Sequence, residues 1–254
     1  MHRHLLPSAL LLGLATAIPA SAETLTKTLD GTELEMHMSC VKSVTIDPQP
    51  DLQGKIQVEA KADALDEIDP LEFSSGSTAR IDRKGDCRLS HPTLTLAIKV
   101  PPATAVDLSD AGSGDYRIGA LGALLRVSVA GSGTVHAAET TGFDARVAGS
   151  GNIDLDRVNG PGKIEIRGSG DVTIRDGVMP TFAIELRGSG NAKLSQGSVG
   201  VLAASLTGSG NIHVGGTVKD ASLSSTGSGN IDVTRATGAV QRSKAGSGEI
   251  TVGK

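Results

Sequence analysis

The stretch "AGSGNIDL" (Ala148–Leu155) recurs almost letter for letter as "TGSGNIHV" (Thr207–Val214) and "TGSGNIDV" (Thr226–Val233). The Gly-Ser-Gly triplet inside it occurs eight times, at steps of 18 to 20 residues. A near-constant period of this length is typical of a solenoid, in which each repeat forms one coil. The triplets begin at Gly112, Gly131, Gly149, Gly168, Gly188, Gly208, Gly227 and Gly246.

The segments between triplets alternate between apolar and variable residues. Ile153 and Leu155 follow one triplet, and Ile164 and Ile166 precede the next. Such a period of two indicates short strands with one buried face, and the frequent glycines disfavour helices. Two or three short strands cannot close a core alone, so each coil must stack on the next. The sequence therefore predicts an all-β fold, a parallel β-helix.

The triplet itself resembles a phosphate-binding loop, but a helix and a Lys-Ser/Thr pair would have to follow it, and neither does. We interpret it as a tight corner between strands, where glycine can adopt positive φ angles. The polar residue after each triplet is expected to bond the turn and to stack as a ladder through the coils. These residues include Asp115, Asn152, Asp171, Asn191, Asn211 and Asn230.

The chain divides into three predicted segments. Residues 1–22 have a basic start, an apolar run and small residues at the end, which indicates a secretory signal peptide cleaved near Ala22. Residues 23–110 lack triplets and alternate like antiparallel strands, so they are expected to form a β-rich cap and the first coils. Residues 111–254 hold the repeats. In the last coil, Arg242 and Lys244 occupy inward positions, so the apolar column is expected to end there.

Composition excludes several classes of function. The chain has 254 residues, 33 of them glycine, with 2% aromatic residues and no Trp, so it lacks the flat aromatic faces of stacking platforms. The formal net charge of −4 gives no reason to expect nucleic acid as a partner. After the signal peptide no segment is apolar enough to span a membrane. We expect a protein of the periplasm, or one that is secreted or at the cell surface.

Two cysteines, Cys40 and Cys87, follow the signal peptide. In an oxidising compartment they are expected to form one disulfide. Met36 and Met38 precede Cys40 in "MHMSC", which could suggest soft-metal ligands, but the alternation favours packing in the core. The Gly-rich turns also lack the spacing of calcium-binding nonapeptides. We expect neither a metal nor a cofactor.

No pattern of catalytic residues emerges. Asp154 and Asp232 share a repeat position, but the coils between them should place them too far apart to act together as general acid and general base. The histidines are scattered, and no Gly-x-Ser-x-Gly elbow is present. The acidic run of Asp63, Asp66, Glu67 and Asp69 is interpreted as a solvated loop.

One outward face of the predicted coils shows order. It should carry a stacked patch of mixed charge, which gives way to hydroxyl rows at Ser205, Thr207, Ser224 and Thr226. The charges could serve solubility alone, and the hydroxyl rows could contact a glycan or a surface. The candidate binding face comprises Arg146, Glu165, Arg167, Glu185 and Arg187.

The alternating N-terminal region, the segment "LTLAIKVPPATAVDLSDAGSGDYRI" (Leu94–Ile118) and the repeated "GSGNI" and "GSGDV" motifs resemble the bacterial family of putative auto-transporter adhesin head, or GIN, domains. The resemblance extends roughly over residues 41–248. It implies a right-handed parallel β-helix of the pectate-lyase-like kind. It implies no catalytic residues.

These observations favour a non-enzymatic binding or scaffold protein of the bacterial cell envelope. Its partner would be an envelope or extracellular polysaccharide or another protein. Two alternatives stay open: a carbohydrate-active β-helix enzyme, and a purely structural envelope protein without a ligand.

Overall fold

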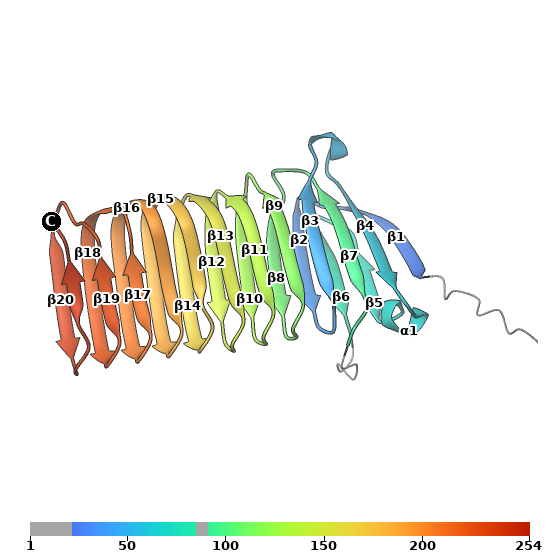
Figure 1. Ribbon diagram of the computed structural model, residues 1–254. Helices are drawn as coiled ribbons and strands as arrows, with labels where there is room; N and C mark the ends of the chain where they lie inside the picture. Colours follow the sequence, from blue (N-terminus) through green and yellow to red (C-terminus); the bar gives the residue numbers. More distant parts are fainter. Residues whose placement is uncertain (1–21, 85–90) are drawn as a thin grey trace, which may run out of the picture.

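The computed structural model describes residues 22–84 and 91–254, and it shows an elongated β-solenoid (Figure 1). Successive coils place strands in two columns, A and B, whose inward side chains share one core. The parallel solenoid predicted from the repeats is thereby confirmed. The predicted signal peptide, residues 1–22, lies outside the described part of the chain except for Ala22.

Column A runs from the N-terminal end of the solenoid to its C-terminal end. Its strands, in spatial order, are β5 (Leu71–Ser74), β6 (Thr78–Arg83), β2 (Glu33–Met38), β8 (Ala105–Asp110), β10 (Leu124–Val129), β12 (Gly142–Val147), β14 (Gly162–Gly168), the second halves of β15 (Val172–Gly188) and β16 (Asn191–Gly208), β18 (Thr217–Gly227) and β20 (Val240–Ala245).

Column B runs alongside it. Its strands, in the same direction, are β1 (Glu23–Asp30), β4 (Lys55–Ala62), β7 (Thr95–Val100), β3 (Ser43–Pro48), β9 (Asp115–Ala120), β11 (Thr134–Thr140), β13 (Asn152–Asn159), the first halves of β15 and β16, β17 (Asn211–Val214), β19 (Asn230–Val233) and β21 (Ile250–Val252).

The core is a set of apolar rows that follow the solenoid axis. In column A, Ile164 pairs in register with Ile184, and the row continues through Ala204 and Leu223. All four side chains are buried. Because one coil cannot bury its own apolar face, this stacking supplies most of the hydrophobic stabilisation.

The Gly-Ser-Gly triplets stack on one another at one corner, as predicted. The amide of Ser189 donates to the carbonyl of Gly168 over 3.0 Å, and the amide of Ser209 repeats this contact with Gly188, again over 3.0 Å. Among the triplet glycines, the first glycines of the later triplets, from Gly168 onward, have positive φ angles. In the earlier triplets the glycine is needed for space: a Cβ on Gly131 would lie 1.9 Å from the carbonyl oxygen of Gly112.

From Asn152 onward, the polar residues after the triplets form the predicted ladder, whereas Asp115 is separated from Asn152 by Thr134. The Nδ2 of Asn211 donates to Oδ1 of Asn191 over 3.1 Å, and the Nδ2 of Asn191 donates to Oδ1 of Asp171 over 2.9 Å. Oδ1 of Asp171 also accepts the backbone amide of Asn191 over 2.8 Å. The ladder therefore bonds the backbone of the next coil, rather than only its own turn.

The N-terminal region departs from the expected antiparallel arrangement. Antiparallel pairing is found for β1 with β4, β4 with β7, and β5 with β6. The other strands are parallel, and the coil made by β2 and β3 lies between the β6–β7 coil and the β8–β9 coil. The chain therefore adds two coils to opposite sides of its first one, and parallel stacking begins with β6 and β7.

A short helix, α1 (Leu65–Ile68), and a 3₁₀ turn, η1 (Pro50–Leu52), complete the N-terminal end. Within residues 22–84 and 91–254, no helix is long and apolar enough to cross a membrane. Of the acidic run around α1, Asp63, Asp66 and Asp69 are exposed, as a solvated loop requires. Glu67 is the exception, because its side chain is buried.

Glu67 ties α1 to the segment immediately before β7. Its carboxylate accepts the amide of Thr93 over 2.8 Å, the hydroxyl of Thr93 over 2.5 Å and the amide of Leu94 over 3.2 Å. Burial alone would raise the pKa of this carboxyl, but the three hydrogen bonds outweigh it and hold the pKa below its usual value.

We expect Glu67→Gln to lower the free energy of unfolding by about 2 kcal/mol at pH 7, because a neutral amide is a weaker acceptor for two amides and a hydroxyl. A depressed folded-state pKa stabilises the fold above the unfolded pKa, and this contribution is lost as the pH falls through the folded value. Denaturant unfolding of both proteins at pH 7 and pH 3 checks this. A difference that does not shrink at pH 3 would contradict the assignment.

The C-terminal end keeps the register but loses the core. Arg242 pairs with Leu223 and Lys244 with Ser225, so both cations occupy inward positions, as predicted. Every residue of β20 after Val240 is exposed. The apolar column therefore ends at β18 and β19, with only partly buried residues beyond it.

Candidate functional site

The outer face of column A carries the five charged residues predicted to form a binding face. Register pairs Arg146 with Glu165 and Glu165 with Glu185, which gives one row along the axis. Arg167 pairs with Arg187 in the neighbouring row. The structure thus brings all five together across β12, β14 and β15.

Ion pairs neutralise most of this charge. The guanidinium of Arg146 lies 3.5 Å from Asp144 and 3.6 Å from Glu165. Arg167 lies 2.5 Å from the other oxygen of Glu165. Arg187 pairs with Glu185. The arginine side chains are more than half exposed, so the pairs contribute little to stability and their outer groups are accessible to a ligand.

Further toward the C-terminal end the same rows become uncharged. Ala183, Ala203 and Ser222 continue the row of Lys163. The row of Glu185 continues through Ser205 and Ser224, and the row of Arg187 continues through Thr207 and Thr226. Small hydroxyl and methyl groups at strand spacing therefore make this part of the face nearly flat.

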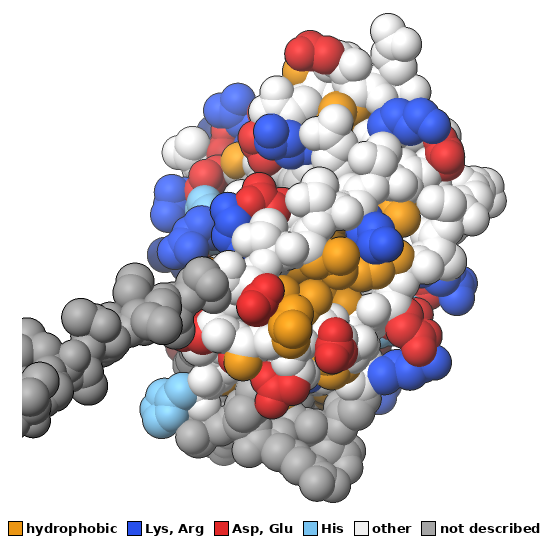
Figure 2. Space-filling view, turned by 90° about the vertical axis from the view of Figure 1, so that its right-hand side faces the viewer, with side chains coloured by type: hydrophobic (Ala, Val, Ile, Leu, Met, Phe, Trp, Pro, Cys, Tyr) orange, Lys and Arg blue, Asp and Glu red, His pale blue; other side chains and the backbone are white. Residues whose placement is uncertain are grey.

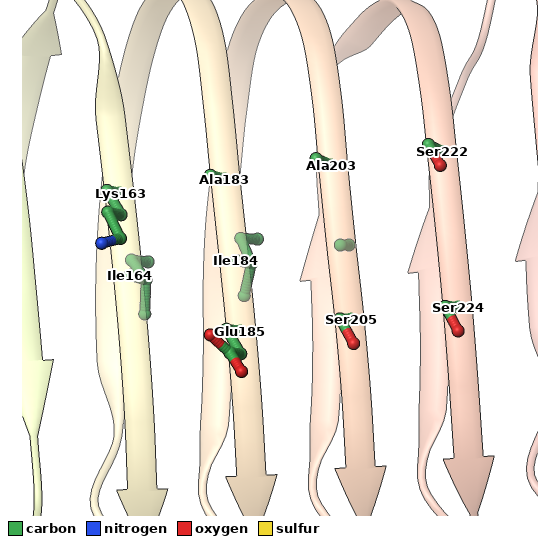
Figure 3. A pocket seen from close by; sticks show the side chains of 10 residues that line it. Lys163, Ile164, Ala183, Ile184, Glu185, Ala203, Ser205, Ser222 and Ser224 are labelled. Atoms are coloured by element: carbon green, nitrogen blue, oxygen red, sulfur yellow. The ribbon is translucent and has the colours of Figure 1, made fainter.

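A shallow depression of about 300 Å³ lies where the charged and uncharged parts meet (Figure 3). Figure 3 shows Ala183 and Ala203 between the longer Lys163 and the serines, so the hollow follows from side-chain size. Lys163 has no ion pair within the described residues, whereas Glu185 is paired. The depression thus has the unpaired ammonium group of Lys163 on one side, serine hydroxyls on the side opposite Lys163, and apolar carbons in its floor.

The predicted core role of the methionines near Cys40 is confirmed. Met36 and Met38 are buried, while His37 points outward and its Nδ1 lies 2.7 Å from Asp82. Cys40 is 3% exposed, but Cys87 lies outside the described residues, so their disulfide stays a prediction.

The other candidate residues lie apart. His213 pairs with Asp232 over 2.8 Å on column B, and His136 lies 3.4 Å from Asp156. Asp154 occupies the row of Asp232, with three intervening coils. Within residues 22–84 and 91–254, no group of three His, Cys, Asp or Glu side chains could hold a metal ion.

One buried carboxylate escaped the sequence analysis. Asp110 is 2% exposed and occupies an inward position between Met38 and Val129. Its Oδ1 accepts the amide of Gly112 over 3.0 Å and the hydroxyl of Tyr116 over 2.9 Å. Its Oδ2 is buried without a partner. A polar residue at an inward position of "VDLSD" was the signal that could have identified it.

Burial raises the pKa of Asp110, although the two hydrogen bonds oppose this. Burial also raises the pKa of Tyr116, and the nearby carboxyl adds to this effect. Burial thus shifts both groups toward their neutral forms. Asp110 belongs to the structural corner at the first triplet, where a charge would be poorly solvated.

We expect Asp110→Asn to become more stable relative to the parent protein as the pH rises from 4 to 8, by about 1 kcal/mol. A raised folded-state pKa stabilises the fold below the unfolded pKa, and this contribution is lost as the pH rises through the folded value. The asparagine keeps the acceptor for Gly112 and Tyr116 but has no charge to bury. Unfolding curves at the two pH values check this, and parallel changes in both proteins would contradict it.

The stacked parallel strands place the protein in the class of parallel β-solenoids, and the comparison with known proteins agrees with this fold. The chain matches the family described as "Putative auto-transporter adhesin, head GIN domain" over residues 26–216 and 157–254. It therefore belongs to this family. No curated protein matches the chain.

Solved structures share the fold at low sequence identity. A "putative lipid binding protein" from Parabacteroides distasonis is 19% identical, with a TM-score of 0.70, and the match covers 93% of this chain and 98% of that one. A "putative adhesin" from the same organism is 19% identical, with a TM-score of 0.71 and coverage of 92% and 98%. A "putative adhesin" from Parabacteroides merdae is 17% identical, with a TM-score of 0.69 and coverage of 93% and 98%.

Proposed function

We propose that this protein is a non-enzymatic binding protein of the bacterial cell envelope, exported to the periplasm or cell surface. Its outer face on column A would hold a hydroxyl-rich polymer, such as an envelope or extracellular polysaccharide. The observation that carries the proposal is the depression across β14, β15, β16 and β18, which joins a paired-charge patch to flat hydroxyl rows. The adhesin family and the signal-like N-terminus support the location.

The chemistry of the face suits such a ligand better than it suits a reactive substrate. Lys163 offers one cation for an acidic sugar, and Ser205, Ser222 and Ser224 offer donors and acceptors for sugar hydroxyls. Exposed groups of this kind each contribute little, so affinity must come from many repeated contacts along an extended chain. The rigid spacing of the coils provides that repetition.

The test is retention of the purified protein on a panel of immobilised neutral and acidic polysaccharides, with new reducing or unsaturated ends recorded in the same samples. We expect retention without cleavage. Ala203→Trp should fill the depression and reduce retention about tenfold. Thr173→Trp, on the outer face of column B, is the matched control and should leave retention unchanged.

A second variant separates the two parts of the face. Replacing Arg146, Arg167 and Arg187 together by alanine should weaken binding to acidic polysaccharides more than to neutral ones. Cleavage products would replace the proposal with a carbohydrate-active enzyme. Retention on lipid vesicles alone would replace the polysaccharide with a lipid surface, and no retention on any surface would favour a structural role.

A further inference from the structure

The N-terminal end of the solenoid exposes an apolar hollow. Between the outermost strands β1 and β5 lies a concavity of about 370 Å³. Figure 2 faces this end and shows the apolar patch with acidic side chains around it. Leu65, the most exposed of the apolar lining residues, is 55% exposed. The apolar lining comprises Leu25, Leu65, Ile68, Leu71 and Phe73.

Unpaired carboxylates accompany this hollow. Asp69 lines it, Asp66 lies in the first turn of α1, and Asp63 lies two residues before that helix. All three are exposed and have no ion pair within the described part of the chain. The lining contains one cation, Lys27, which lies on β1 in column B.

The C-terminal end has the opposite charge. Arg242 and Lys244 on β20 are exposed and have no ion pair in residues 22–84 and 91–254. Beside them, Val240, Ile250 and Val252 are partly buried hydrophobic residues on the outermost strands. Like the N-terminal end, this end therefore combines apolar surface with charge.

We propose that the C-terminal end of one copy docks onto the N-terminal end of the next, so that the solenoids associate head to tail. The apolar residues of β20 and β21 would cover the hollow, and Arg242 and Lys244 would meet the carboxylates of Asp66 and Asp69. A second pair has the opposite signs, since Lys27 on β1 would meet Glu249, which precedes β21. The charges of the two ends are thus complementary for both pairs.

Charge also selects this orientation. At the N-terminal end three carboxylates outnumber Lys27, and at the C-terminal end Arg242 and Lys244 outnumber Glu249. Two like ends would therefore repel each other through their net charge, so both like-end contacts are disfavoured. A head-to-tail contact uses two different surfaces and leaves one of each free, so it repeats into an open filament rather than closing into a dimer. Such a filament would also line up the outer faces of column A.

The test is sedimentation velocity over a concentration series, with the protein as its host cell processes it, at low and high salt. We expect the average mass to rise with concentration and the association to weaken at least tenfold in high salt. The pair Arg242→Glu and Lys244→Glu should abolish self-association, and so should the pair Asp66→Lys and Asp69→Lys. Mixing the two variants should restore it, because each reversed end then meets a complementary one.

The matched control is the pair Lys193→Glu and Lys219→Glu, which changes the net charge as much as the Arg242 and Lys244 pair does but lies on β16 and β18 rather than on the terminal strands β20 and β21. It should associate like the parent protein. Circular dichroism melts of all variants exclude unfolding as the cause. A protein that stays monomeric at every concentration and salt overturns the proposal, as does a mixture of the two reversed variants that fails to associate.

Discussion

Replacing Gly188 by alanine is expected to lower the free energy of unfolding by about 3 kcal/mol or more, which is large for a single methyl group. Gly188 has a φ of 144°, and a Cβ there would lie 2.2 Å from the carbonyl oxygen of Gly168. The obstacle is backbone of the adjacent coil, which also accepts the amide of Ser189. It cannot move without breaking the stack.

Ser189→Ala is the control, since this side chain is exposed in the same triplet. Its effect should stay within about 0.5 kcal/mol. Chemical denaturation of the parent and the two variants measures both values. Equal stability of Gly188→Ala and the parent would mean that the corner is more adaptable than stacked carbonyls allow.

The repeated triplets made much of the fold predictable. A fixed period near 19 residues requires equivalent residues to stack, and the inward pairs such as Ile164 and Ile166 then define the core. The same logic placed Asn191 next to Asn211 in a ladder and grouped Arg146 with Glu165. These features depend only on how the strands of successive coils align, and the repeat period fixes that alignment.

The arrangement of the first coils could not be predicted in this way. Leu34 and Met36 alternate with polar residues, but alternation does not say which strand lies alongside or in which direction. The β2–β3 coil is covered on both sides by segments that occur later in the chain. Without a repeated triplet, nothing local in the sequence specifies that order.

The depression on column A was also missed for a physical reason. Ala183 and Ala203 are unremarkable in the sequence, because a small residue creates a hollow only when its neighbours in adjacent coils are larger. Lys163 stands beside them through register rather than through sequence proximity. Such a depression depends on a difference in side-chain size between adjacent coils. The charged residues could therefore be identified from the sequence, but the depression beside them could not.

Differences in side-chain size between adjacent coils also determine the packing of the core. Here Phe182→Ala is expected to lower the free energy of unfolding by about 3–5 kcal/mol. Phe182 is 1% exposed and pairs in register with Gly162, whose other neighbour in this row is Phe143. A Cβ on Gly162 would lie 3.1 Å from the Phe182 ring and 2.8 Å from the sulfur of Met179. The glycine therefore makes room for the ring.

A double-mutant cycle separates this packing from a general loss of core. Gly162→Ala should destabilise the parent protein, because the added methyl crowds the ring of Phe182 and the sulfur of Met179. In the Phe182→Ala background the same methyl should cost about 1 kcal/mol less, since the ring that it crowded is gone. Thr181→Ala, at the exposed neighbouring position, is the control. Additive effects of the two core changes would show that Gly162 and Phe182 are not matched in size, and the row would then owe its packing to Met179 instead.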